Sequence, residues 1–206
     1  MDDFSLFEGD PLNRLFLRLG LRSSGALALT ARVSFLLLLT CVPTMYFAWH
    51  EGYASGRPRA LNFFGDLGAL AQAFLGYPLF VIAESVISKK TRSAAKHFLT
   101  SGVIPPEGIN DLRKIHERMN GIRRWLLPDL ICLALGFCLS MGWLYDETHN
   151  QLDTWPAIGA PGVQTPTLAG WWVAIFGIPI FNYWWLRWIW KVQLWCWYLA
   201  KVSRQR

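Results

Sequence analysis

The sequence predicts an all-α membrane protein: four transmembrane helices with an N-terminal interfacial helix and a cytoplasmic helical hairpin. Of its 206 residues, 53% are hydrophobic and 17% are charged, whereas a soluble domain is about 25% charged. Four apolar stretches are each long enough to cross a bilayer, which takes about 20 helical residues. We therefore expect one integral membrane domain over residues 1–206. The composition argues against both an intrinsically disordered chain and a soluble enzyme.

The interfacial helix is predicted over residues 11–22. Pro11 suits the first helical position, and Asp10 before it is a suitable N-cap. Leucines and Phe16 recur on one helical face, while Arg14 and Arg18 take the opposite side. This pattern is typical of a helix that lies in the membrane interface with its arginines facing anionic headgroups. The alternative is a helix that packs on another part of the protein. The acidic start of the chain argues against a cleavable signal peptide.

Four spans account for most of the remaining chain. They are expected at about 26–49, 67–87, 125–145 and 168–190. Residues 88–124 form the most polar long stretch, and a Pro-Pro pair divides it, which predicts a basic hairpin of two helices that projects beyond the bilayer. The loop 146–167 contains three prolines and no Lys or Arg, and we expect it to be irregular.

The distribution of Lys and Arg predicts the orientation. The N-terminal segment has four, residues 88–124 have nine, and the end from Arg187 onward has five, against two and none in the opposite loops. Basic residues collect on the cytoplasmic side, so both termini are predicted to be cytoplasmic. Topology therefore explains the net charge of +6, and no nucleic-acid partner is expected. Six of the basic residues are expected to contact anionic lipid headgroups: Arg14, Arg18, Lys89, Lys90, Arg123 and Arg124.

Four ionisable residues fall inside the apolar stretches, all at a similar height near the predicted cytoplasmic boundary. They are Arg32, Glu84, Asp129 and Arg187. Ionisable groups in spans point to function by default, so one interpretation is a charged inner girdle around the mouth of a pathway. The other is structural pairing with side chains that extend to the interface. No acid, base or His lies near the middle of a span, which argues against a proton relay.

Three prolines lie near the middle of spans one, two and four: Pro43, Pro78 and Pro179. Each removes a backbone hydrogen bond and predicts a helix kink. Kinks would suit a gated pathway, although proline is common in membrane helices. The polar residues expected to bond the freed carbonyls across helices are Thr40, Thr44, Gln72 and Asn182.

Span four is rich in tryptophan, with eight of the twelve between Trp171 and Trp197. At 100° per residue, one aromatic face contains Phe181, Trp184, Trp188 and Trp195. Tryptophan prefers the membrane interface, which predicts a helix along the inner headgroups. The alternative is an aromatic pocket for a lipid, a quinone or another hydrophobic substrate.

Metal, cofactor and catalytic motifs are not found in the sequence. The four cysteines form no C-x-x-C pair. The loop residues Asp146, Glu147, His149 and Asp153 have no tight ligand spacing, and we interpret them as a solvated acidic loop. We therefore expect no metal, no cofactor and no catalytic residues.

The stretch NYWWLRWIWKVQLWCWYLAKVSR, from Asn182 to Arg204, resembles a segment of uncharacterised multi-pass inner-membrane proteins of bacteria. The resemblance implies a bacterial inner-membrane location and no particular activity. In that family the chain continues beyond this segment, so the resemblance implies that Arg206 is an early stop.

The predicted function is that of a non-enzymatic membrane protein, either a channel-like oligomer or an accessory subunit of a membrane complex. Its partners would be membrane lipid and a second copy or another membrane protein. The alternative is a membrane-embedded enzyme or binding protein for a lipid-like substrate at the cytoplasmic face. An enzyme would need a carboxylate or His pair there, and Glu84 and Asp129 are the candidates.

Overall fold

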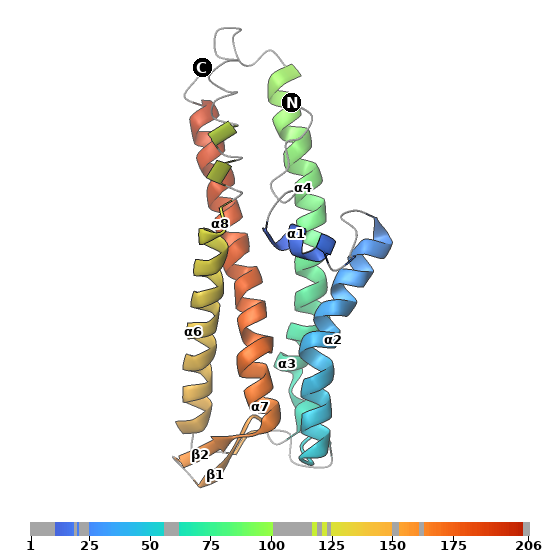
Figure 1. The fold of residues 1–206 in the computed structure, drawn as a ribbon, viewed down its shortest axis with the longest axis vertical. Coiled ribbons are helices and arrows are strands. Elements are labelled where there is room, and N and C mark those ends of the chain that lie inside the picture. Colours follow the sequence, from blue (N-terminus) through green and yellow to red (C-terminus); the bar gives the residue numbers. More distant parts are fainter. Residues whose placement is uncertain are drawn as a thin grey trace.

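A computed structural model shows a mostly helical chain built from long, nearly antiparallel helical runs (Figure 1). The structure describes residues 11–18, 20, 25–55, 62–100, 117–118, 121–122, 125–149, 153–160 and 163–203. The first long helix is α2 (Ala26–His50). The second run joins α3 (Leu67–Ala71), the π-helical turn η3 (Gln72–Gly76) and α4 (Tyr77–Thr100).

The other two long runs lie side by side. Helix α6 (Leu127–His149) packs along α8 (Ile178–Ser203), which follows α7 (Leu168–Trp172) and the π-helical turn η5 (Val173–Gly177). The start of α2, the end of α4, the start of α6 and the end of α8 all point toward one end of the molecule, and α4 and α8 extend furthest toward it (Figure 1). We call this end the basic end, because the exposed residues Lys89 and Lys90 lie toward it. The opposite end carries a two-stranded β-hairpin, and we call it the hairpin end.

The hairpin end is more regular than the sequence predicts. Strand β1 (Ala157–Ala160) pairs with β2 (Val163–Pro166) in an antiparallel hairpin, so the expectation of an irregular loop over 146–167 was wrong. The prolines misled the prediction: Pro156 precedes β1 and Pro166 ends β2, positions where a missing N–H costs no ladder bond. A short 3-10 helix, η2 (Phe63–Gly65), leads into α3 at the same end.

Three of the helical runs are long and apolar enough to cross a membrane: Leu27–His50, Leu67–Ala94 and Leu127–His149. These correspond to the first three predicted spans. The run Leu168–Ser203 does not join them, because its eight tryptophans and its polar groups lower its mean hydropathy. The second half of the predicted 88–124 hairpin lies mostly outside the described residues. Its first half continues α4 as far as Thr100.

Both π-helical turns stand directly before a proline. The residue before Pro78 is Tyr77, whose N–H bonds the Gln72 carbonyl five residues back, and Ile178 before Pro179 bonds Val173 in the same way. Proline cannot donate to the carbonyl four residues back, and its ring pushes against that carbonyl. A wider turn relieves this conflict, which is why π-bulges accompany helix kinks.

Donors from other helices bond carbonyls near two of the three prolines, Pro43 and Pro179. Trp172 Nε1 donates to the Leu39 carbonyl at 3.1 Å, and Leu39 is the residue whose helical partner Pro43 removes. Near Pro179, Tyr77 Oη donates to the Gly177 carbonyl at 2.9 Å and Ser140 Oγ to the Ala174 carbonyl at 2.6 Å. The expected donors were wrong for α2: Thr40 and Thr44 bond carbonyls of their own helix, which lie closer.

Small residues on α6 bring it close to α8. The buried positions of α6 recur every four residues, at Cys132, Gly136, Ser140 and Leu144. A Cβ atom at Gly136 would lie 2.9 Å from the Pro179 carbonyl oxygen, so only glycine lets α6 and α8 approach this closely. Contact through small residues is the usual way in which membrane helices pack. The rest of α6 is largely exposed and apolar.

Helix α1 (Pro11–Arg18) runs across the long helices (Figure 1). Phe16 is buried and packs edge-on against Phe35 of α2, while Arg14 and Arg18 are exposed. The structure thus shows a helix that packs on the protein through Phe16. Contact of its arginines with lipid headgroups stays a prediction.

Candidate functional site

The four ionisable residues of the predicted charged girdle lie between the long helices. Each comes from a different helix: Arg32 from α2, Glu84 from α4, Asp129 from α6 and Arg187 from α8. We call these four residues the buried charge cluster: Arg32, Glu84 and Arg187 are buried, and Asp129 is partly buried. On each helix, the residues three and four positions before and after the charged residue are mostly apolar. The helices therefore pack through the faces that carry the charges, and this packing brings the four charges to one level.

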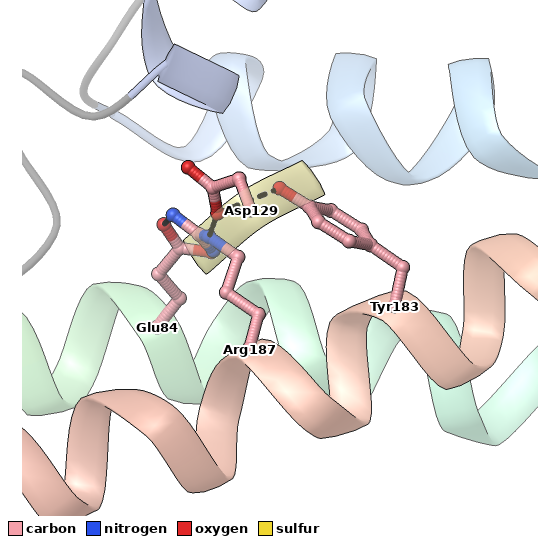
Figure 2. Close-up of polar contacts among 4 residues, drawn as sticks. All are labelled: Glu84, Asp129, Tyr183 and Arg187. Atoms are coloured by element: carbon pink, nitrogen blue, oxygen red, sulfur yellow. Dashed lines mark hydrogen bonds and ion pairs between the residues drawn. The ribbon is translucent and has the colours of Figure 1, made fainter. Parts of the chain in front are cut away.

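Arg187 is the centre of the cluster. Its side chain has no exposed surface, and it lies between two carboxylates (Figure 2). Nη1 lies 3.2 Å from Glu84 Oε2 and Nη2 lies 3.5 Å from Glu84 Oε1, which is a two-point contact. Nε lies 3.6 Å from Asp129 Oδ1. A guanidinium presents donors in a planar fork, so one arginine can join α4 and α6 to α8 at once.

Asp129 has a second partner on α8. Tyr183 Oη donates a hydrogen bond to Asp129 Oδ1 at 3.2 Å (Figure 2). Tyr183 precedes Arg187 by one helical turn, so both side chains leave the same face of α8. Lys191 follows one turn later and is also buried. The face of α8 toward α6 is therefore a polar row within a tryptophan-rich helix.

Arg32 completes the cluster from α2. Its guanidinium carbon lies 4.9 Å from the centre of the Phe16 ring of α1, a cation–π contact. The Arg32 guanidinium also interacts electrostatically with Glu84, which attracts it, and with Arg187, which repels it. Arg32 thus connects α1 with the charges between the long helices. Its exposed fraction is 8%, the same as that of Glu84.

A small cavity with a mainly apolar lining lies further toward the hairpin end. Its volume is about 50 Å³, and its polar lining consists of Thr40, Thr44, Gln72 and Tyr77. Both π-helical turns contribute to its wall, through Ala73 and through Val173 with Gly177.

The predicted aromatic face is divided among different neighbours. Phe181 packs edge-on against Tyr77 and Phe80, and Trp184 stacks on Phe80 and is almost fully buried. Trp195 lies further along α8 and stacks on Tyr198 of the same helix. Trp188 is half-buried. This part of α8 therefore packs into the bundle through Phe181 and Trp184.

The remaining predicted residues are dispersed. Lys89 and Lys90 are exposed at the basic end, and Arg123 and Arg124 lie outside the described residues. Glu147 receives a hydrogen bond from Thr154, and Asp153 receives one from the Gly159 N–H. Across the described ranges, no group of three or more His, Cys, Asp or Glu side chains could hold a metal ion.

Sequence reasoning missed Tyr183, Lys191, Tyr77 and Trp172 as partners in these contacts. The spacing of Tyr183, Arg187 and Lys191 at i, i+4 and i+8 could have revealed the polar row on α8. Nothing local marks Tyr77 or Trp172, because their acceptors lie on other helices.

No protein-family model, curated protein or solved structure matches the chain. The functional argument therefore depends on its own residues.

Proposed function

We propose that this chain is a non-enzymatic integral membrane protein that serves as an accessory subunit of a membrane complex. In this proposal the run Leu168–Ser203 supplies a fourth crossing beside the three apolar helices, with both termini on the cytoplasmic side of a bacterial inner membrane. The close packing of α6 against α8 supports the fourth crossing.

The burial and pairing of Arg187 carry the proposal. A charged vestibule needs side chains that water or an ion can reach, whereas Arg187 is fully enclosed and bonded to two other helices. In some proteins a buried ion pair specifies a single arrangement of elements, and we propose the same role for the contacts of Arg187. The cluster therefore favours a fixed helical unit over an open inner mouth. Glu84 and Asp129 are also engaged by Arg187, which disfavours the alternative of a carboxylate pair that acts on a lipid-like substrate.

The apolar surface of α6 supports the need for a partner. Apart from its row of four buried residues, α6 exposes large side chains such as Leu130, Leu133, Leu135 and Phe137. Lipid can cover such a surface, and so can a partner helix. An accessory subunit would use this face as its contact.

Purification in mild detergent followed by mass determination tests the proposal. An accessory subunit should co-purify with a constant set of membrane proteins, and Leu135→Ala should weaken that association while thermal stability is unchanged. Thr30→Ala, an exposed change on α2, is the control. A chain that migrates alone under all conditions would refute the accessory role.

A channel-like oligomer is the second candidate, and the cavity between the π-helical turns favours it. π-bulges often occur at functional sites, and both π-helical turns contribute to the wall of this cavity. A ring-sized homo-oligomer with conductance in planar bilayers, altered by Tyr77→Phe, would support this candidate over the first.

A further inference from the structure

A larger pocket lies at the hairpin end, at the opposite end of α6 from Asp129 of the buried charge cluster. Its volume is about 580 Å³, within the range of small-molecule sites. Helix α6 contributes Trp143 and Glu147, the start of α3 contributes Asp66, and the segment before β1 contributes Thr154, Trp155 and Pro156. We call it the acidic pocket.

Hydrogen bonds hold its two carboxylates in place. Asp66 Oδ1 accepts from the Ala69 N–H at 3.0 Å, which caps α3, and Oδ2 accepts from Trp155 Nε1 at 2.9 Å. Glu147 Oε2 accepts from Thr154 Oγ1 at 2.8 Å. Thr154 and Trp155 are consecutive, so one short segment anchors both carboxylates at the same pocket. Each carboxylate keeps lone pairs for a further donor.

An indole stands beside one carboxylate. Trp143 and Glu147 are four residues apart on α6 and therefore leave the same helical face. Trp143 is half-buried, whereas Trp155 is buried with the Phe63 ring edge-on to it at 5.1 Å. Trp143 is thus the ring that a ligand in the pocket can contact.

The charge of the pocket is unbalanced. It presents two carboxylates, and its described lining includes no Lys or Arg. Among the described residues, no third His, Cys, Asp or Glu side chain joins Asp66 and Glu147 to form a group that could hold a metal ion. Indole rings do not ligate such ions, but they attract organic cations over their faces. Carboxylates and an indole together recognise an ammonium group.

We propose that the acidic pocket binds an organic cation through its ammonium group, with Glu147 and Asp66 as counter-charges and Trp143 as the cation–π partner. The ammonium group is either that of a free amine or quaternary amine, or the headgroup of a lipid such as phosphatidylethanolamine. The proposal does not depend on the accessory role.

Titration calorimetry on the full chain in maltoside micelles tests the free-ligand source, with choline and ethanolamine as probes. Native mass spectrometry from nanodiscs of equal phosphatidylethanolamine and phosphatidylglycerol tests the lipid source. We expect one probe to bind, and we expect Glu147→Gln to lower the affinity for that probe at least tenfold. The glutamine still accepts the Thr154 hydrogen bond, so folding should persist. Trp143→Leu, expected to weaken binding several-fold, is a second variant that leaves both carboxylates intact.

Asp146→Asn is the matched control, because it removes the same charge from the exposed neighbour of Glu147. It should leave affinity within twofold of the parent chain. Binding of calcium chloride in place of the amines would overturn the assignment. So would the absence of binding in both arms, or equal losses for Asp146→Asn and Glu147→Gln.

Discussion

Replacing Arg187 with Gln is the most direct perturbation of the buried charge cluster. The change removes the two-point contact with Glu84 and the contact with Asp129 in one step, and it leaves two carboxylates among the helices. Two opposite charges 4 Å apart attract by about 4 kcal/mol at an effective dielectric constant of about 20. Desolvation offsets part of this gain, and the loss of one partner from a buried pair costs about 3–5 kcal/mol. We expect Arg187→Gln to lie at the upper end of that range.

Removing one carboxylate should lower the free energy of unfolding less than Arg187→Gln does, because each carboxylate variant leaves Arg187 with one partner. Asp129→Asn should be the milder, since its contact of 3.6 Å is a single one, whereas Glu84 makes two. The double variant Asp129→Asn with Arg187→Gln removes a pair together. It should recover about 0.5–3 kcal/mol relative to the sum of the two single losses, the usual coupling between residues in contact.

Unfolding by SDS in mixed micelles, followed by far-UV circular dichroism, measures these differences in free energy. Arg18→Gln is the control, since Arg18 is an exposed arginine, and a surface change should stay within about 0.5 kcal/mol. Strict additivity of the single and double variants would refute the reasoning. The four charges would then act independently, and the argument for a fixed helical unit would lose its basis.

Three further predictions concern topology, lipid binding and helix packing. Cysteine labelling from outside the cell should modify an engineered Cys at Asn150 and leave one at Asn110 unmodified; the reverse pattern would invert the orientation. Replacing four basic residues with Gln in one variant should weaken binding to anionic liposomes and reduce its salt sensitivity, because each basic residue near the surface contributes about 1 kcal/mol; equal binding would mean that these residues only set topology. The four changed residues are Lys89, Lys90, Arg123 and Arg124. Gly136→Ala should destabilise the α6–α8 contact by about 1–3 kcal/mol in the same SDS titration, whereas Gly142→Ala, on the same helix with open space around it, should not destabilise; equal effects would refute the close approach.

Local properties of the chain determine the helices and the height of the charges. Length and hydropathy mark the three apolar helices, because crossing a bilayer requires a fixed number of apolar residues. Proline removes a backbone donor wherever it stands, so Pro78 and Pro179 mark where the helices change to π-helical turns. The sequence also places the four ionisable residues at one level, because a helix rises by a constant distance per residue.

Contacts between distant parts of the chain required the tertiary structure. The level of the charges does not show that Arg187 binds both carboxylates while Arg32 turns to Phe16, since side-chain partners depend on how the helices rotate and cross. The donors for the carbonyls near the prolines are also remote: Tyr77 and Gly177 are 100 residues apart. The acidic pocket likewise forms only when Trp155 reaches Asp66, 89 residues earlier, because such a hydrogen bond depends on folding in three dimensions and leaves no periodic pattern in the sequence.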